Sequence, residues 1–233
     1  MKAVHVCIEG FTASFRHPLL YSGKRISTPM PSYSNLIGLI GACAGRQIAP
    51  SETRIAFEFR CRGYDTELEH ATRWQYKRGR LIPQVGGLHH HGILIRPRLD
   101  LFLSNVEIGH AFLNTKSTPT LGRSQDVAWI KRVGDVELIQ ESDGDLGPTL
   151  APEGFNVPGL PIRLAEWVEN SSFGMLRVIG PLGRYRAMSP YIENGKSRHR
   201  VSGPNLFHPS DATEERDVVY LHEWLEGTHG LIS

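Results

Sequence analysis

The sequence predicts an α+β protein with a ferredoxin-like βαββαβ core, an extended β-hairpin and a small β-rich C-terminal region. Short segments with alternating apolar residues indicate strands, and an apolar segment with capping signals indicates a helix after the first strand. The summed order of strand, helix, strand, excursion, strand, helix and strand is that of the ferredoxin-like fold. With 40% hydrophobic and 21% charged residues among 233, the composition excludes disordered, collagen-like and coiled-coil proteins.

The first strand is predicted over residues 2–11, because apolar residues occupy every second position from Val4 to Ile8. Residues 12–31 follow, and they hold three prolines and several cations. This segment is too long for a turn, so we interpret it as a functional loop.

A helix is predicted over residues 33–45, beginning after Pro31-Ser32 and ending at a C-terminal cap on Gly45. Gly38 and Gly41 lie inside it, and each costs about 1 kcal/mol relative to alanine. Their presence predicts that a sheet or another backbone approaches this helix closely.

The next elements are predicted from period-2 and turn signals. Residues 55–61 form a strand with a basic outer face, and residues 64–92 form a long basic hairpin or excursion. A strand over 93–104 and a short helix over 106–113 follow.

The second half of the chain is less regular. A strand or strand pair is predicted over 127–140, with a turn at Gly134-Asp135, and a short amphipathic helix over 164–169. Prolines and glycines concentrate between these segments. The predicted organisation is therefore a core over 1–142, a linker over 143–161 and a C-terminal appendage over 162–233.

Charge and hydropathy limit the classes of partner. The formal net charge is only +2, so attraction to nucleic acid must come from local clusters. The longest uncharged apolar stretch, 36–45, falls short of the roughly 20 residues that cross a membrane, and we expect a cytoplasmic protein without membrane contact. The three cysteines lie in apolar sequence surroundings, so we expect them to be buried free thiols: Cys7, Cys43 and Cys61.

Aromatic and cationic residues interleave near the end of the predicted hairpin. Such pairing allows a protein to stack on bases while it neutralises phosphates, so one interpretation is contact with nucleic acid. The alternative interpretation is a hairpin face that is simply solvated. The residues are Trp74, Tyr76, Lys77, Arg78 and Arg80. A second basic stretch with tyrosines covers 184–200 and has the same two interpretations.

No metal site or cofactor is expected. The consecutive histidines 89–91 would point to opposite faces of a strand, and no cysteine or carboxylate partner lies nearby in sequence. Common catalytic motifs for nucleotide, serine-hydrolase or zinc chemistry are absent. Metal-free RNA cleavage by His17, Tyr21 and Lys24 stays open beside the simpler interpretation, a polar loop that contacts a partner.

Four segments of the chain form a recognisable set: Gly10-Phe11, the loop 15–18, the helix entry 29–42 and the turn 121–124. Together they resemble the Cas-five family of CRISPR-associated proteins, part of the repeat-associated RNA-binding superfamily. The resemblance covers about residues 1–140.

The resemblance implies a subunit of a type I CRISPR surveillance complex (Cascade) that grips the 5′ handle of the guide RNA. It also implies a modified RNA-recognition-motif fold, in which the hairpin is called the thumb. The partners would be the guide RNA and the backbone and large subunits, with target DNA an indirect partner. The implied RNA-binding residues are Arg16, His17, Ser34, Asn35, Arg123 and Ser124 around the handle, and Trp74, Tyr76, Lys77, Arg78 and Arg80 on the thumb.

One subfamily of these proteins cleaves the repeat transcript with a tyrosine before the helix entry and a later Lys-His pair. Ile26 stands in the tyrosine's place here, and the chain has no adjacent Lys-His pair. We therefore expect a non-catalytic protein. The alternatives are a metal-independent repeat endoribonuclease and a protein-interaction module of the same complex.

Overall fold

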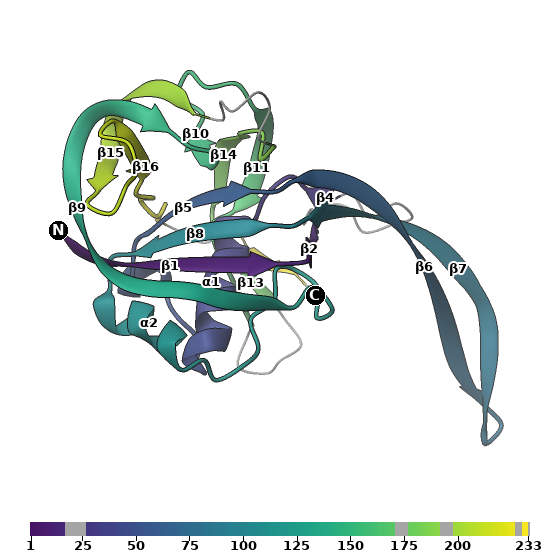
Figure 1. Ribbon diagram of the computed structural model, residues 1–233. Coiled ribbons are helices and arrows are strands. Elements are labelled where there is room, and N and C mark those ends of the chain that lie inside the picture. Colours follow the sequence, from purple (N-terminus) through teal and green to yellow (C-terminus); the bar gives the residue numbers. More distant parts are fainter. Residues whose placement is uncertain (17–26, 171–176, 192–197, 227–229, 233) are drawn as a thin grey trace.

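A curled, mostly antiparallel sheet forms the centre of the computed structural model (Figure 1). The structure describes residues 1–16, 27–170, 177–191, 198–226 and 230–232. The sheet has six strands in the order β15-β16-β9-β1-β8-β5. They are β1 (Lys2–Gly10), β5 (Ile55–Arg60), β8 (Arg98–Leu103), β9 (Ala128–Leu146), β15 (His199–Pro209) and β16 (Asp217–Tyr220).

Two helices cover one face of this sheet: α1 (Tyr33–Ala44) and the short α2 (Val106–His110), which continues as the 3-10 turn η2 (Ala111–Leu113). Apolar side chains from β1, β5, β8 and α1 fill the space between them and form the main core. The polar residues that alternate with these apolar ones consequently lie on the other face of the sheet.

The helix α1 confirms the predicted helix. Ser32 and Asn35 form a capping box at its beginning, and Gly45 ends it with a left-handed φ of 73°. A Cβ on Gly41 would lie 2.9 Å from the carbonyl oxygen of Arg46, so the expected close approach comes from the turn after the helix. For Gly38 the expectation is wrong, because a Cβ there would meet no atom within 4 Å.

The predicted strands over 2–11 and 55–61 correspond to β1 and β5. The strand predicted over 93–104 is interrupted, because Arg96 has a positive φ of 52° and Pro97 follows it. Within the sheet β1 lies between β8 and β9, β5 lies beside β8, and all of these neighbours are antiparallel.

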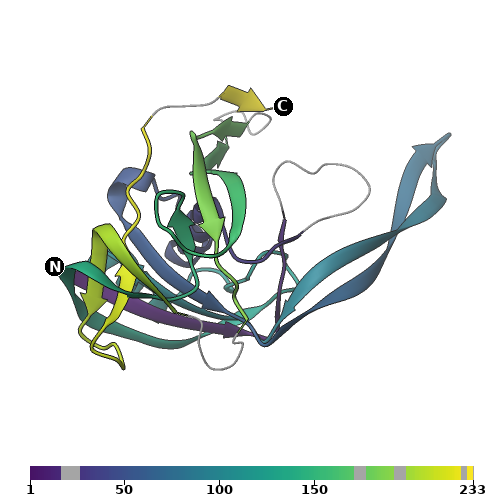
Figure 2. The same ribbon diagram turned by 90° about the horizontal axis from the view of Figure 1, so that it is seen from above.

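The excursion predicted over 64–92 is a long hairpin, here called the thumb, made of β6 (Gly63–Lys77) and β7 (Arg80–Ile95). It projects far from the body in both ribbon views (Figure 2). Arg78 and Gly79 close it with φ values of 47° and 77°, the two positive values that a type I′ turn requires.

The predicted turn at Gly134-Asp135 is wrong. The strand β9 runs unbroken through both residues, with Gly134 opposite His5 of β1. Continuous pairing with β1 supplies the backbone hydrogen bonds that a turn would have broken, and this pairing outweighs the local turn signal.

Residues 143–161, predicted as a linker, carry regular structure. They contain the end of β9 and β10 (Leu150–Pro152), and Phe155 is buried in the core. The helix predicted over 164–169 is wrong, because β11 (Leu160–Ala165) occupies its beginning. Ile162 and Leu164 alternate there with exposed Arg163, which is strand periodicity.

The remaining elements are short. β10, β11 and β14 (Leu182–Ala187) form a three-stranded sheet in the order β10-β14-β11. The others are β2 (Thr12–Ala13), β3 (Phe15–Arg16), β4 (Ser27–Thr28), η1 (Pro50–Glu52), β12 (Val168–Asn170), β13 (Arg177–Ile179) and β17 (Gly230–Ile232).

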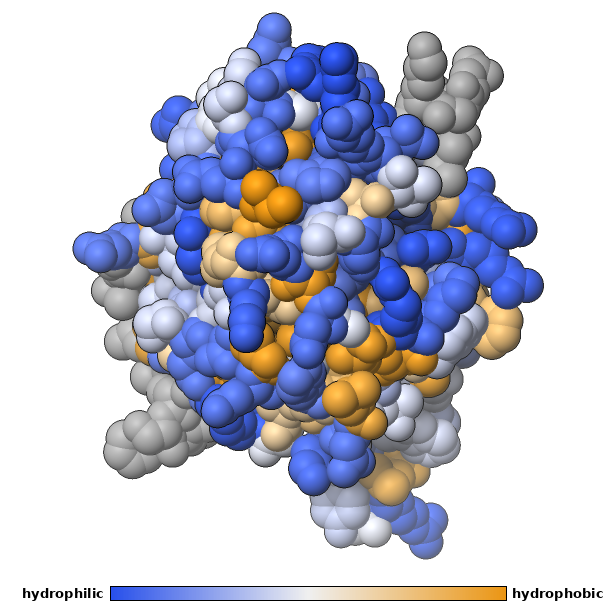
Figure 3. Space-filling view, turned by 60° about the vertical axis from the view of Figure 1, so that its left-hand side comes forward, coloured by the Kyte–Doolittle hydropathy of each residue, from blue (hydrophilic) through white to orange (hydrophobic). Residues whose placement is uncertain are grey.

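On one face of the molecule, hydrophobic residues form small patches between hydrophilic ones (Figure 3). The three cysteines are buried and free, as predicted, and burial raises the pKa of each thiol to about 11. In the described part of the chain, no helix combines the length and apolarity needed to cross a membrane.

Candidate nucleic-acid interface

The tip of the thumb has one apolar face. Trp74 lies opposite Pro83, and Tyr76 lies opposite Leu81. Directly opposed residues and residues two apart along a strand share a face, so these four side chains form one surface. Trp74 is 61% exposed and Tyr76 is 71% exposed, which leaves both rings accessible for stacking.

The opposite face of the tip is cationic. It carries Arg73 and Lys77 of β6, with Arg80 directly opposite Lys77, and all three are exposed. Arg78 adds a further cation in the turn. The rings and the cations interleave in the sequence, and the strands place them on opposite sides of the hairpin. The period-2 spacing of Trp74 and Tyr76 already contained this signal.

A second candidate surface lies where α1 begins. A hollow of about 240 Å³ is bordered there by Ser34, Asn35 and Gly38 of the helix and by the loop 120–122. Asn35 is exposed, and its Oδ1 accepts a hydrogen bond from the backbone N–H of Ser32, 3.1 Å away. Free N–H groups at a helix N-terminus favour phosphate.

Arg123, expected beside this hollow, points elsewhere. Its guanidinium donates to Asp126 at 2.9 Å and to Glu67 of β6 at 2.7 Å. These hydrogen bonds, chiefly the one to Asp126, raise the pKa of Arg123. Arg123 thus ties its loop to the base of the thumb, while Ser124 is exposed on that loop.

The other expected residues are placed as follows. Arg16 is exposed in β3, opposite Ser27 of β4. His17, Tyr21 and Lys24 lie outside the described residues. In the histidine run, His90 is exposed, whereas His91 is buried with its Nε2 2.5 Å from a Glu69 carboxylate oxygen. No group of three or more potential metal ligands occurs among the described residues.

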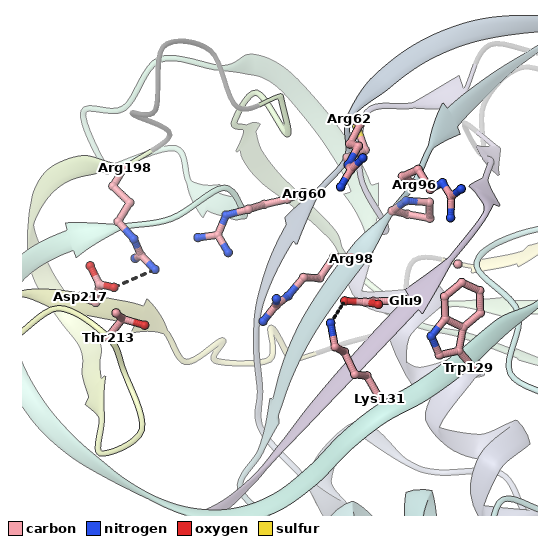
Figure 4. Close-up of a pocket in the computed structure, with 13 residues that line it drawn as sticks. Glu9, Arg60, Arg62, Arg96, Arg98, Trp129, Lys131, Arg198, Thr213 and Asp217 are labelled. Atoms are coloured by element: carbon pink, nitrogen blue, oxygen red, sulfur yellow. Dashed lines mark hydrogen bonds and ion pairs between the residues drawn. The ribbon is translucent and has the colours of Figure 1, made fainter.

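A third surface was not predicted. A hollow of about 960 Å³ opens on the sheet face opposite the helices (Figure 4). One row across the sheet contributes Trp129, Glu9, Arg98 and Arg60, which are successive partners on β9, β1, β8 and β5. The hollow is lined by six cations, Arg60, Arg62, Arg96, Arg98, Lys131 and Arg198, and by two carboxylates, Glu9 and Asp217.

Ion pairs hold several of these cations in place. The Arg98 Nε donates to Asp100 at 2.8 Å, the Lys131 Nζ to Glu9 at 2.6 Å, and the Arg198 Nη1 lies 2.8 Å from a Glu58 oxygen. Burial alone would raise the pKa of Asp100, but hydrogen bonds from His5 and Arg98 hold it well below its usual range. The carboxylates beneath the surface therefore orient the cations.

Comparison with known proteins gives a fold match. No protein-family model matches the chain, and no curated protein matches it. A chain of a solved structure described as a CRISPR RNA-guided surveillance complex superposes with a TM-score of 0.54 at 14% identity, covering 89% of this chain and 91% of that one. The protein shares the fold of that chain. The resemblance inferred from the sequence is confirmed at the level of the fold.

Two further solved structures are similar to this chain. A CRISPR protein from Archaeoglobus fulgidus has a TM-score of 0.47 at 14% identity, covering 96% of this chain and 100% of that one. A chain of the Type III-B Cmr-beta complex bound to cognate target RNA and AMPPnP has a TM-score of 0.48 at 8% identity, covering 87% and 86%.

Sequence reasoning missed the hollow for a physical reason. Its cations come one or two at a time from segments that are far apart in sequence, and they converge only through the strand order. The local signals for it were the basic outer face predicted for 55–61 and the basic stretch 184–200, which contributes Arg198.

Proposed function

We propose that the protein is a non-catalytic guide-RNA-binding subunit of a type I CRISPR surveillance complex, as in the Cas-five family. It grips the 5′ handle of the guide RNA in the cytoplasm and caps the filament of backbone subunits, beside the large subunit. The observation that carries the proposal is the exposed thumb, with a stacking face and a cationic face, on a body with a CRISPR surveillance-complex fold.

The core of the proposed subunit is ferredoxin-like, a modified RNA-recognition motif. The order β9-β1-β8-β5 and the antiparallel neighbours support this assignment, together with α1 and α2 on one face. In this assignment Arg16, His17 and the α1 entry at Ser34 and Asn35 hold the handle.

The thumb acts through two kinds of contact. Lys77, Arg78 and Arg80 neutralise phosphates, and each contact releases counterions, so affinity falls as salt rises. Trp74 and Tyr76 on the opposite face stack on unpaired bases. Stacking of this kind is available in single-stranded RNA and tolerates any base sequence.

The test is a binding titration across a salt series in chelator. The RNAs are the end-labelled 5′ handle of the protein's own CRISPR repeat, the whole repeat and a scrambled RNA. Replacing Lys77, Arg78 and Arg80 by glutamine is expected to weaken handle binding about tenfold or more. It should also reduce the salt slope by about 2, since each single-strand phosphate contributes about 0.7.

The matched control replaces three exposed cations outside the thumb by glutamine: Lys2, Arg163 and Arg216. It should leave both affinity and slope unchanged. Equal losses in the two triple variants would contradict a specific role of the thumb. A discrete cut within the repeat in chelator would replace the non-catalytic assignment with the endoribonuclease alternative.

A further inference from the structure

Two aromatic rings and an arginine meet at the root of the thumb. Phe11 is 63% exposed and Trp129 is 39% exposed, and their ring centroids are 5.1 Å apart. The guanidinium of Arg96 lies 5.0 Å from the centroid of the Phe11 ring. Large rings are usually buried on folding, so two adjacent exposed rings form an apolar surface that faces solvent at a free-energy cost.

The backbone at Arg96 carries a second cost. Its φ of 52° lies in the left-handed region, which a long side chain rarely adopts and where glycine fits without strain. An arginine that is held in such a conformation, exposed and above an aromatic ring, is typical of a functional position.

Backbone hydrogen bonds between the chain segments that meet at the thumb root hold the two rings and Arg96 in place. The Arg96 N–H donates to the Phe11 carbonyl at 2.9 Å, and the Arg62 N–H donates to the Ile95 carbonyl at 2.8 Å. The Gly10 N–H donates to the Pro97 carbonyl at 3.1 Å. The aromatic surface is therefore built in advance of binding, on crossing segments rather than on one mobile loop.

The cationic hollow begins beside these rings, and Trp129 and Arg96 belong to its lining. Figure 4 places Trp129 and Arg96 at one end of it, with Arg198 and Asp217 at the other. Arg62 and Arg96 are both exposed at the aromatic end. The six cations outnumber the two carboxylates of the lining and the two that pair with them from beneath, Glu58 and Asp100. This excess favours a polyanion over an apolar protein surface, and exposed rings beside it favour a polyanion with unpaired bases.

We infer that the rings of Phe11 and Trp129, with Arg96 and Arg62, form a stacking subsite for one unpaired base of single-stranded RNA. The phosphates on either side of that base contact the two arginines, and the strand continues into the cationic hollow. This inference rests on the proposed RNA-binding function and deepens it. It adds a contact on the sheet face at the thumb root, separate from the thumb tip.

The test uses the handle RNA with a single 2-aminopurine placed at each position in turn, because stacking quenches the fluorescence of this base. Bound to the wild-type protein, one position outside those that stack on Trp74 and Tyr76 of the thumb is expected to be quenched strongly. Phe11→Ala and Trp129→Ala should each abolish that quenching and weaken binding about tenfold, whereas Trp129→Phe should retain most of it. Circular dichroism checks that each variant is folded.

Arg96→Gly separates binding from folding. Glycine relieves the positive φ, so this variant should be as stable as the wild type or more stable, yet bind RNA several-fold more weakly with a smaller salt slope. The proposed function fails if the wild type binds no handle RNA. If the wild type binds RNA through its thumb but none of these variants changes quenching or affinity, the stacking subsite alone is overturned.

Discussion

At Gly122 the loop after residue 120 lies so close to Ser14 that there is no room for a side chain. Its φ is 111°, and a Cβ would overlap the carbonyl oxygen of Ser14, whose N–H bonds to the Leu121 carbonyl. Gly122→Ala is expected to lower the free energy of unfolding by about 2 kcal/mol or more, from backbone strain and displacement of the segment around Ser14. Urea unfolding measures this.

Gly38→Ala is the matched control, because a Cβ at this helical position meets nothing within 4 Å. It should raise the free energy of unfolding by about 0.5 to 1 kcal/mol. If both alanine variants unfold at the wild-type urea concentration, the positive φ of Gly122 is not a structural requirement.

These two glycines also illustrate what residue types can predict. A glycine inside a helical pattern costs stability, and that cost suggests a close neighbour; Gly41 has one, but Gly38 has none. The requirement at Gly122 arises from Ser14, more than a hundred residues away in sequence. Only the fold brings these two segments together.

The thumb is an element whose tip contributes little to the core. Its side chains from Thr72 to Gln84, including Trp74 and Tyr76, are exposed. Replacing residues 71–87 by Asn-Gly should therefore change the melting temperature by only a few degrees, since His70 and Leu88 are direct partners that a two-residue turn can join. Handle affinity should fall at least as far as in the triple glutamine variant.

Thermal melting followed by the same RNA titration checks this prediction. A fall in melting temperature of more than about 10 °C would show that the tip stabilises the body. Unchanged handle affinity in a folded, shortened protein would instead remove the thumb from the proposed interface.

Among the helices and strands, the sequence predicted best those that have strong local signals. The strands β1 and β5 and the helix α1 have strong period-2 or capping signals, and the structure has all three. The turn predicted inside β9 failed because pairing with a distant strand decides the conformation there. The division of the thumb tip into two faces follows from strand periodicity once the hairpin register is known.

At the scale of the molecule, strands from distant parts of the chain share one sheet. β9 pairs with β1 along its first half and with β15 along its second, and it pairs with β16 in parallel. A smaller apolar cluster on the second face joins residues such as Phe102, Leu138 and Phe207. Sequence analysis could not predict these contacts or the cationic hollow, because both depend on strand order.

A buried histidine makes the stability of this assembly depend on pH. The His5 Nε2 lies 3.1 Å from an Asp100 oxygen, and its Nδ1 lies 2.7 Å from an Asp211 oxygen. Burial opposes protonation, but the hydrogen bonds and charges of the two carboxylates outweigh it, so the pKa of His5 is raised above 6.5. Arg132 also donates to Asp211, at 2.6 Å.

The direction of the effect follows from linkage. Protonated His5 stabilises the fold fully below pH 6.5, and this stabilisation is lost as pH rises through the raised pKa. The pKa values of Asp100 and Asp211 are lowered, so their contribution is lost only as pH falls below about 3.8. The free energy of unfolding should therefore decrease from pH 6 towards pH 9.

His5→Gln should flatten that decrease, whereas His90→Gln, an exposed change on the thumb, should leave it as in the wild type. Urea unfolding at a series of pH values measures both. An identical pH dependence in the wild type and in His5→Gln would contradict a stabilising charge on His5.

The position of β1 at the centre of the sheet also has a consequence for biosynthesis. Its partners β8 and β9 begin at Arg98 and Ala128, so both leave the ribosome long after β1 itself. Until then the backbone groups of this strand stay unpaired, and such open strand edges promote association between nascent chains. A ribosome that stalls before residue 128 would hold a chain whose first strand still lacks its β9 partner.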